Sequence, residues 1–301
     1  MKNFLLFAIL SLTVLTAKAQ NALYYNSTDG SAAIVALGAD NGLSVVKESV
    51  DLLGKDWTNA VHTGGKVLLY NNKTGAGAIA TVTATDLKVN NTFDVGKLPT
   101  GYTHLIGLNS GRVLCYNATD GSGNVGSVTA NNEYKNLKSF PAGTLPKGWT
   151  HIIAVNTVAG ATKIVYYNSA TGAAAIGSIA SDGMPQIAKN YEAGKFTPGW
   201  TSLVSVEGKI IYYNANTGAA VLGMLPPNNE HQTIKTYQAD GFPKGFTHLT
   251  NINGKIVYYN AQTGGTAVGV VTSSEHIFAK PEAGTIKPNF TSALKGMVTI
   301  K

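Results

Sequence analysis

The sequence predicts an all-β fold made of six copies of one unit. Two marks define the unit: a Tyr-Asn pair, and an aromatic residue followed by Thr. The Asn residues of successive pairs are 45, 46, 51, 46 and 46 positions apart. The pairs are Tyr25-Asn26, Tyr70-Asn71, Tyr116-Asn117, Tyr167-Asn168, Tyr213-Asn214 and Tyr259-Asn260. A period in the forties is typical of propeller blades, so we expect a six-bladed β-propeller.

The aromatic-Thr mark shows where each unit begins. It occurs at Trp57-Thr58, Tyr102-Thr103, Trp149-Thr150, Trp200-Thr201, Phe246-Thr247 and Phe290-Thr291. In the unit that starts at Trp149, four strand candidates follow, at residues 150–155, 163–167, 173–179 and 186–191. They are short and mostly apolar or β-branched, and turn residues separate them. Each unit is therefore predicted to be a four-stranded blade.

The two ends of the chain predict how the ring closes. Residues 290–294 match the first-strand residues 200–204, but no further Tyr-Asn pair follows them. The N-terminal unit starts almost directly at Tyr24 and lacks a first strand of its own. We expect the C-terminal strand to join the N-terminal blade, which would leave no open sheet edge at the closure.

Residues 1–19 have the layout of a secretory signal peptide. Lys2 precedes an apolar stretch, and Ala17-Lys18-Ala19 resembles a cleavage site. The apolar stretch is too short to span a bilayer. We expect residues 20–301 to form a single propeller domain without membrane insertion. It would be secreted, or periplasmic in a bacterium with two membranes.

Composition excludes some classes of partner. Without residues 1–19 the chain has 21 basic and 16 acidic side chains, and Arg112 is its only Arg. Because basic residues form no run, the charge pattern of a nucleic-acid binder is missing. Cys115 is the only Cys, so no disulfide can form within one chain.

Strand alternation should bring both marks to one face of the disc. Each Asn is followed four residues later by Gly, preceded by Thr or Asp, which is the chemistry of a hairpin turn. We interpret this half of the unit as structural.

The aromatic half gives the candidate ligand residues. Aromatic rings at a loop-to-strand junction can stack on a sugar ring, although they can also pack between blades. A His follows the Thr in three units, where other units have Asn or Ser, so this position is a hydrogen-bonding one, either structural or sugar-binding. The candidates are Trp57, Tyr102, His104, Trp149, His151, Trp200, Phe246 and His248.

Catalysis finds no support among the motifs. The chain has no G-x-S-x-G elbow, no H-E-x-x-H and no carboxylate pair that recurs between units. We therefore expect no enzymatic activity, no catalytic residues, no metal and no cofactor.

The blade unit resembles the tachylectin-2-type propeller family. The residues that carry the resemblance are Gly-Trp-Thr-His at 148–151, then Val165-Tyr166-Tyr167-Asn168 and the Thr171-Gly172 turn. The resemblance covers essentially the whole mature chain, although this chain has six units where the namesake has five. It implies carbohydrate binding at pockets repeated around the ring. We therefore expect a secreted, multivalent lectin-like protein with weak sites between blades and glycans or cell-surface polysaccharides as partners. The alternative is a non-enzymatic scaffold for protein interaction or adhesion.

Overall fold

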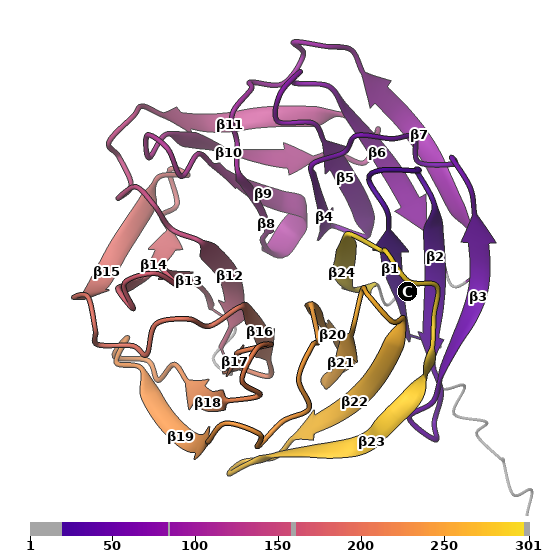
Figure 1. The fold of residues 1–301 in the computed structure, drawn as a ribbon. Coiled ribbons are helices and arrows are strands. Elements are labelled where there is room, and N and C mark those ends of the chain that lie inside the picture. Colours follow the sequence, from indigo (N-terminus) through magenta and orange to yellow (C-terminus); the bar gives the residue numbers. More distant parts are fainter. Residues whose placement is uncertain (1–19, 84, 158–160, 298–301) are drawn as a thin grey trace, which may run out of the picture.

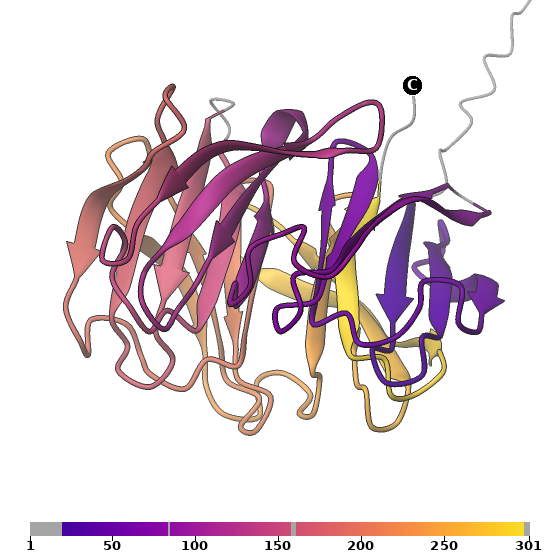
Figure 2. The ribbon, with the colours of Figure 1, turned by 90° about the horizontal axis from the view of Figure 1, so that it is seen from above.

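The prediction of six four-stranded blades is confirmed. A computed structural model describes residues 20–83, 85–157 and 161–297, and the predicted signal peptide lies outside these ranges. They contain six antiparallel sheets of four strands, arranged as a ring around a central axis (Figure 1). Seen from the side, the strands run between two layers of loops (Figure 2). No helix among the described residues is long and apolar enough to cross a membrane.

We number the blades from the N-terminus and list their strands from the axis outward. The innermost strands of blades 1 to 6 are β24 (Ser292–Met297), β4 (Asn59–Thr63), β8 (His104–Gly107), β12 (His151–Asn156), β16 (Ser202–Val206) and β20 (His248–Ile252). The second strands are β1 (Gln20–Tyr25), β5 (Lys66–Tyr70), β9 (Arg112–Tyr116), β13 (Thr162–Tyr167), β17 (Lys209–Tyr213) and β21 (Lys255–Tyr259). The third strands are β2 (Ala32–Leu37), β6 (Gly77–Val82), β10 (Gly123–Val128), β14 (Ala174–Ile179), β18 (Ala220–Met224) and β22 (Gly265–Val271). The outer strands are β3 (Leu43–Ser49), β7 (Leu87–Phe93), β11 (Tyr134–Phe140), β15 (Pro185–Tyr191), β19 (Gln232–Tyr237) and β23 (His276–Thr285). A 3-10 helix, η1 (Asn109–Gly111), joins β8 and β9.

The predicted closure is also confirmed. Strand β24 pairs antiparallel with β1, and Tyr24 faces Ala293 in the register. Figure 1 shows the C-terminal strand β24 beside the N-terminal strand β1, so the first blade contains both ends of the described chain.

The core lies between the blades, because both faces of each sheet are covered. Neighbouring residues of a strand point to opposite faces. We call the contact region between two successive blades a seam. Tyr166 accordingly packs in a cluster with Trp149 and Leu145, which belong to the seam with blade 3. The next residue, Tyr167, packs with Trp200 and Tyr212, which belong to the seam with blade 5.

Each Tyr of a Tyr-Asn pair fastens its blade to the next. Its hydroxyl donates to a carbonyl in the loop that leads into the next blade, at 2.7–2.9 Å in all six copies. In the fourth blade the acceptor is the carbonyl of Thr197, and the same hydroxyl accepts the N–H of Trp200 at 3.3 Å. The repeated Tyr is therefore a staple between blades.

The two sequence marks bind to each other within every blade. The N–H of the Thr donates to the carbonyl of the Tyr, and the Thr hydroxyl accepts the N–H of the residue after the Asn. In the fourth blade the Asn168 side chain accepts from the N–H groups of Ala170 and Thr171 and donates to the Gly148 carbonyl. These bonds confirm the structural interpretation of the turn.

Candidate functional site

The predicted aromatic residues lie between the blades. Tyr102, Trp149, Trp200 and Phe246 are only 5–8% exposed, and each belongs to a core cluster. Trp57 is partly buried against the cluster of the first two blades, and its indole N–H donates to the Leu53 carbonyl. All five rings thus pack at seams. A ligand contact for them stays a prediction.

The three predicted histidines join neighbouring blades. The His151 Nε2 lies 3.1 Å from the carbonyl of Thr201 in the next blade, and its Nδ1 lies 2.8 Å from the hydroxyl of Thr150. A carbonyl only accepts, so Nε2 carries the proton. Burial lowers the pKa of His151, which favours the neutral ring that accepts from Thr150 at Nδ1. His104 and His248 repeat this pattern.

Asn59 explains why Asn can replace His at the position that follows the Thr of the aromatic-Thr mark. Its Oδ1 accepts from the Thr58 hydroxyl at 2.8 Å, and its Nδ2 donates to the Thr103 carbonyl at 3.0 Å. The amide therefore makes the same two bonds as the imidazole. We call this arrangement the inter-blade clasp. Both ring nitrogens of each His are already bonded within the protein. A ligand role for His104, His151 and His248 also stays a prediction.

A groove of about 580 Å³ opens at the seam between blades 4 and 5. Aromatic rings and threonines make up most of its walls. Tyr191 and Phe196 come from the end of the fourth blade, and their rings meet edge to face at 5.2 Å. His231, just before β19 of the fifth blade, lies 4.7 Å from Phe196 and 5.5 Å from Tyr212 between ring centroids. The full lining is Tyr191, Lys195, Phe196, Thr197, Trp200, Tyr212, Ala219, Val221, His231, Thr233, Thr236, Tyr237 and Gln238. We call this groove the 4–5 pocket.

Two buried polar atoms on the wall of the 4–5 pocket have no hydrogen-bond partner. They are the Tyr212 hydroxyl and the His231 Nε2. Burial lowers the pKa of His231 to about 4, so its ring is neutral at pH 7. Burial also raises the pKa of Tyr212, so its hydroxyl keeps its proton. Unmade hydrogen bonds of buried groups cost free energy.

The lining of the 4–5 pocket carries one cation and no acid. The cation is Lys195, in the loop between the two blades, where the corresponding loop of the next seam has Gly241. Such a lining favours a neutral or negatively charged ligand. Among the described residues, no three His, Cys, Asp or Glu side chains are grouped so that they could hold a metal ion.

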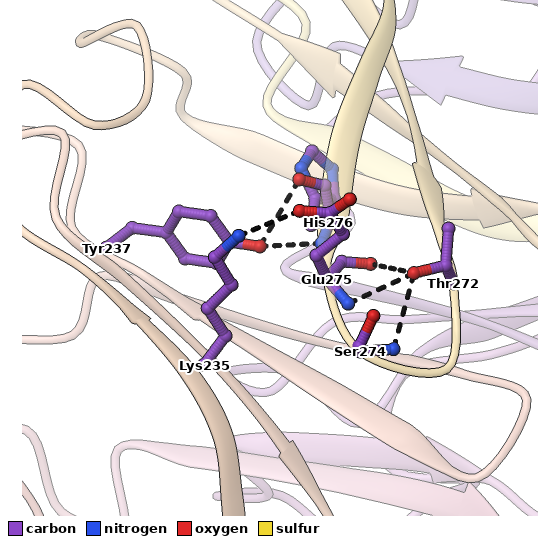
Figure 3. A network of polar contacts seen from close by, with 6 residues as sticks. All are labelled: Lys235, Tyr237, Thr272, Ser274, Glu275 and His276. Carbon is purple, nitrogen blue, oxygen red and sulfur yellow. Dashed lines mark hydrogen bonds and ion pairs between the residues drawn. The ribbon is translucent and has the colours of Figure 1, made fainter.

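The next seam, between blades 5 and 6, repeats the same framework (Figure 3). The Tyr237 hydroxyl accepts the N–H of His276 at 2.6 Å, and Lys235 pairs with Glu275 at 2.7 Å. At the 4–5 seam the Tyr191 hydroxyl accepts the N–H of His231 at 2.8 Å. The two seams are therefore matched in backbone path and in most side chains, and differences between them are informative.

Phe278 is the main difference between the two seams. Thr233 faces Gly223 in the register of the fifth blade, and Phe278 faces Gly269 at the same place in the sixth. The Phe278 ring lies 5.0 Å from Phe242 and 4.8 Å from His276, which correspond to Phe196 and His231. With Phe278 present, the His276 Nε2 lies 2.9 Å from the Tyr258 hydroxyl and both atoms are bonded. Thr233 is too small to fill that volume, which leaves the 4–5 pocket open.

A second depression of about 690 Å³ lies where blades 6 and 1 meet on the face of the two marks. It is lined by Asn26, Thr28, Thr247, His248, Ala261, Asn289, Phe290 and Thr291. Its His248 ring and its two seam threonines, Thr247 and Thr291, already make the clasp and turn bonds described above. The 4–5 pocket, with its unpaired atoms, is the stronger candidate.

Fold and pocket together define a β-propeller with a ligand-sized site between two blades. No family model and no curated protein matches the chain. Solved structures do resemble it. A periplasmic gluconolactonase from Pseudomonas aeruginosa has a TM-score of 0.53 at 12% identity, with 86% of this chain and 82% of that one covered. A Bacteroides fragilis protein provisionally assigned as a 6-phosphogluconolactonase has a TM-score of 0.54 at 11% identity, with 92% and 83% covered.

A chain of a nidogen/laminin complex is similar to the same degree. Its TM-score is 0.55 at 11% identity, with 92% of this chain and 97% of that one covered. At these identities the likeness supports the propeller fold and transfers no activity. The resemblance to the tachylectin-2-type family stays a prediction.

The prediction of a multivalent lectin, with a scaffold as its alternative, has to be corrected. The similar structures include proteins named for lactonase activity, and the expected absence of an enzyme stays a prediction. The seams are moreover not equivalent, since Phe278 occupies in one the volume that Thr233 leaves open in another. Repeated equivalent sites are therefore replaced by one asymmetric candidate site.

Proposed function

We propose that this protein binds one small organic molecule in the 4–5 pocket. The observation that carries the proposal is the pair of unpartnered atoms, Tyr212 Oη and His231 Nε2, on the wall of an aromatic groove. Pockets for small ligands combine apolar walls with a few polar groups that fix orientation. The single Lys195 and the missing acid make a neutral or anionic ligand the better fit.

A second candidate is hydrolysis of a cyclic ester in the same pocket. The lactonase names of similar structures favour it, together with the neutral His231 ring, which has the protonation state of a general base at pH 7. In this reaction His231 would take a proton from the water that attacks the ester carbonyl, and Tyr212 would donate to the carbonyl oxygen. The protonated His231 would then give its proton to the ring oxygen as the ring C–O bond breaks and the hydroxy acid forms. The export predicted from residues 1–19 would make the substrate an extracellular or periplasmic one.

The test uses the aromatic anion 8-anilinonaphthalene-1-sulfonate (ANS) as a probe. We expect the folded protein to bind one ANS, with a rise in dye fluorescence. Thr233→Phe should weaken binding at least tenfold, because it places in the pocket the ring that the matched seam already accommodates. Thr233→Ser is the control and should bind like the parent chain.

Circular dichroism of both variants establishes that they are folded. Equal ANS binding by Thr233→Phe and Thr233→Ser would refute a ligand site in the 4–5 pocket. For the second candidate, release of acid from glucono-δ-lactone is followed in a pH-stat. Hydrolysis that survives both Thr233→Phe and His231→Gln would place the activity elsewhere.

A further inference from the structure

We infer that the ligand of the 4–5 pocket contains a planar six-membered ring with a hydrogen-bonding substituent, seated where the Phe278 ring sits in the next seam. This inference rests on the proposed binding function and adds the ligand class. It follows from comparing two seams of one molecule, which differ at the residue that decides whether the pocket is filled.

The surroundings of the Phe278 ring show what such a site accepts. The ring is 5.0 Å from Phe242, 5.1 Å from Tyr258 and 4.8 Å from His276 between centroids. Two of these contacts are edge to face, and aromatic rings prefer that arrangement. Seam 5–6 thus surrounds one six-membered ring on several sides.

Three corresponding rings, those of Phe196, Tyr212 and His231, line the 4–5 pocket. Phe196 and His231 are 4.7 Å apart between centroids, and Phe242 and His276 are also 4.7 Å apart. Tyr212 and His231 are 5.5 Å apart at 83°, compared with 5.7 Å at 79° for Tyr258 and His276. The rings that surround Phe278 therefore recur at the 4–5 seam with similar spacings, and the Phe196 ring is tilted at 59° to His231 compared with 34° between Phe242 and His276.

The polar atoms of these rings indicate which substituent the ligand ring carries. In the filled seam the imidazole Nε2 and the phenol hydroxyl bond each other at 2.9 Å. In the open seam the corresponding atoms, on His231 and Tyr212, are unpaired although their rings are placed almost identically. A hydroxyl on the ligand ring can both donate and accept, so it would pair with both atoms. The chemical class is a phenol or a similar hydroxylated ring.

Phenol and hexan-1-ol provide the test, because each has one hydroxyl and six carbon atoms but only phenol has a ring. Both are titrated against the ANS complex of the parent chain. We expect phenol to displace ANS at a concentration at least tenfold lower than hexan-1-ol does. Equal displacement, or none by phenol, would overturn the ligand class, while loss of ANS binding in Thr233→Phe would still support the pocket itself.

Opening the filled seam by mutation provides an independent test of the ligand class. Phe278→Thr should create a second such pocket, so that the number of phenol sites measured by calorimetry rises from one to two. Phe278→Val serves as a second variant, because Val45 and Val89 stand at the corresponding register positions of blades 1 and 2. A folded Phe278→Thr or Phe278→Val protein that still binds one phenol would contradict the inference.

Discussion

The two tyrosines at the end of the second strand show how much neighbouring residues can differ in role. Tyr166 and Tyr167 are both buried, but they face opposite seams. The Tyr167 hydroxyl bonds the Thr197 carbonyl and the Trp200 N–H, whereas the Tyr166 hydroxyl has no partner. At the residue scale, therefore, the sequence repeat preserves a hydrogen bond as well as a hydrophobic ring.

Tyr167→Phe is expected to lower the free energy of unfolding by about 1–2 kcal/mol, because it leaves the Thr197 carbonyl and the buried Trp200 N–H without their partner. Tyr166→Phe is the matched control, and it should not lower the free energy of unfolding, because it removes a buried hydroxyl with no bond to lose. Urea unfolding followed by tryptophan fluorescence measures both variants. Equal losses would show that the staple contributes nothing beyond packing.

At the scale of the element, the hairpin turn is held by close backbone approach. Gly172 has φ of 72°, and a Cβ there would lie 2.0 Å from the Phe196 carbonyl oxygen. Its N–H bonds the Asn168 carbonyl, and the Phe196 N–H bonds its carbonyl. A side chain would therefore push apart the turn and the loop into the fifth blade, which also contributes Phe196 to the 4–5 pocket.

Gly194 makes it possible to separate backbone strain from this clash. Gly194 has φ of 80°, but a Cβ there would meet nothing within 4 Å. Gly194→Ala should cost about 1 kcal/mol for the left-handed backbone alone. Gly172→Ala should cost about 1–3 kcal/mol more, because backbone atoms must also move. Thermal unfolding of the two variants compares them, and equal melting temperatures would contradict the close approach.

At the scale of the whole molecule, three concentric sets of contacts join the blades, and the clasp is seen at four of the six seams. The clasps lie near the axis, the aromatic clusters lie in the middle, and ion pairs such as Lys189–Glu230 and Lys280–Asp40 lie at the rim. The rim pairs are exposed, and exposed pairs contribute about 0–1 kcal/mol each. The middle contacts therefore carry most of the stability of the ring.

The repeat explains why the fold was predictable and the site was not. The fold depends on what all six units share, such as the Tyr that staples each blade, and the predicted strand at 186–191 differs from β15 by one residue. The pocket depends on one difference, Thr233 against Phe278, in the most polar and variable strand. A bulge shifts the register just before this position, so the two residues align only once the pairing is known. The eight predicted ligand residues all occupy recurring positions, and the structure places these positions at the contacts between blades.

The histidines of this ring predict a stability that falls with decreasing pH. Burial lowers the pKa of His62 and His276 to about 4 from an ordinary value of 6.5, as it does for His231, and the clasp histidines are shifted in the same direction. The unfolded chain therefore takes up protons first as the pH falls. The stabilising contribution is complete above pH 6.5 and is lost between about pH 6.5 and 4.

Replacing His104, His151 and His248 together by Asn tests the clasp contribution, because Asn59 already makes the same two bonds in the second blade. Urea midpoints are measured at pH 8, 6 and 5. The parent chain should lose stability across this range, and the triple variant should match it at pH 8 but lose less by pH 5, since its clasps do not titrate. A parent midpoint that stays constant from pH 8 to pH 5 would contradict the buried neutral histidines. Parallel loss in both proteins would mean that His62, His231 and His276 alone set the pH dependence of the ring.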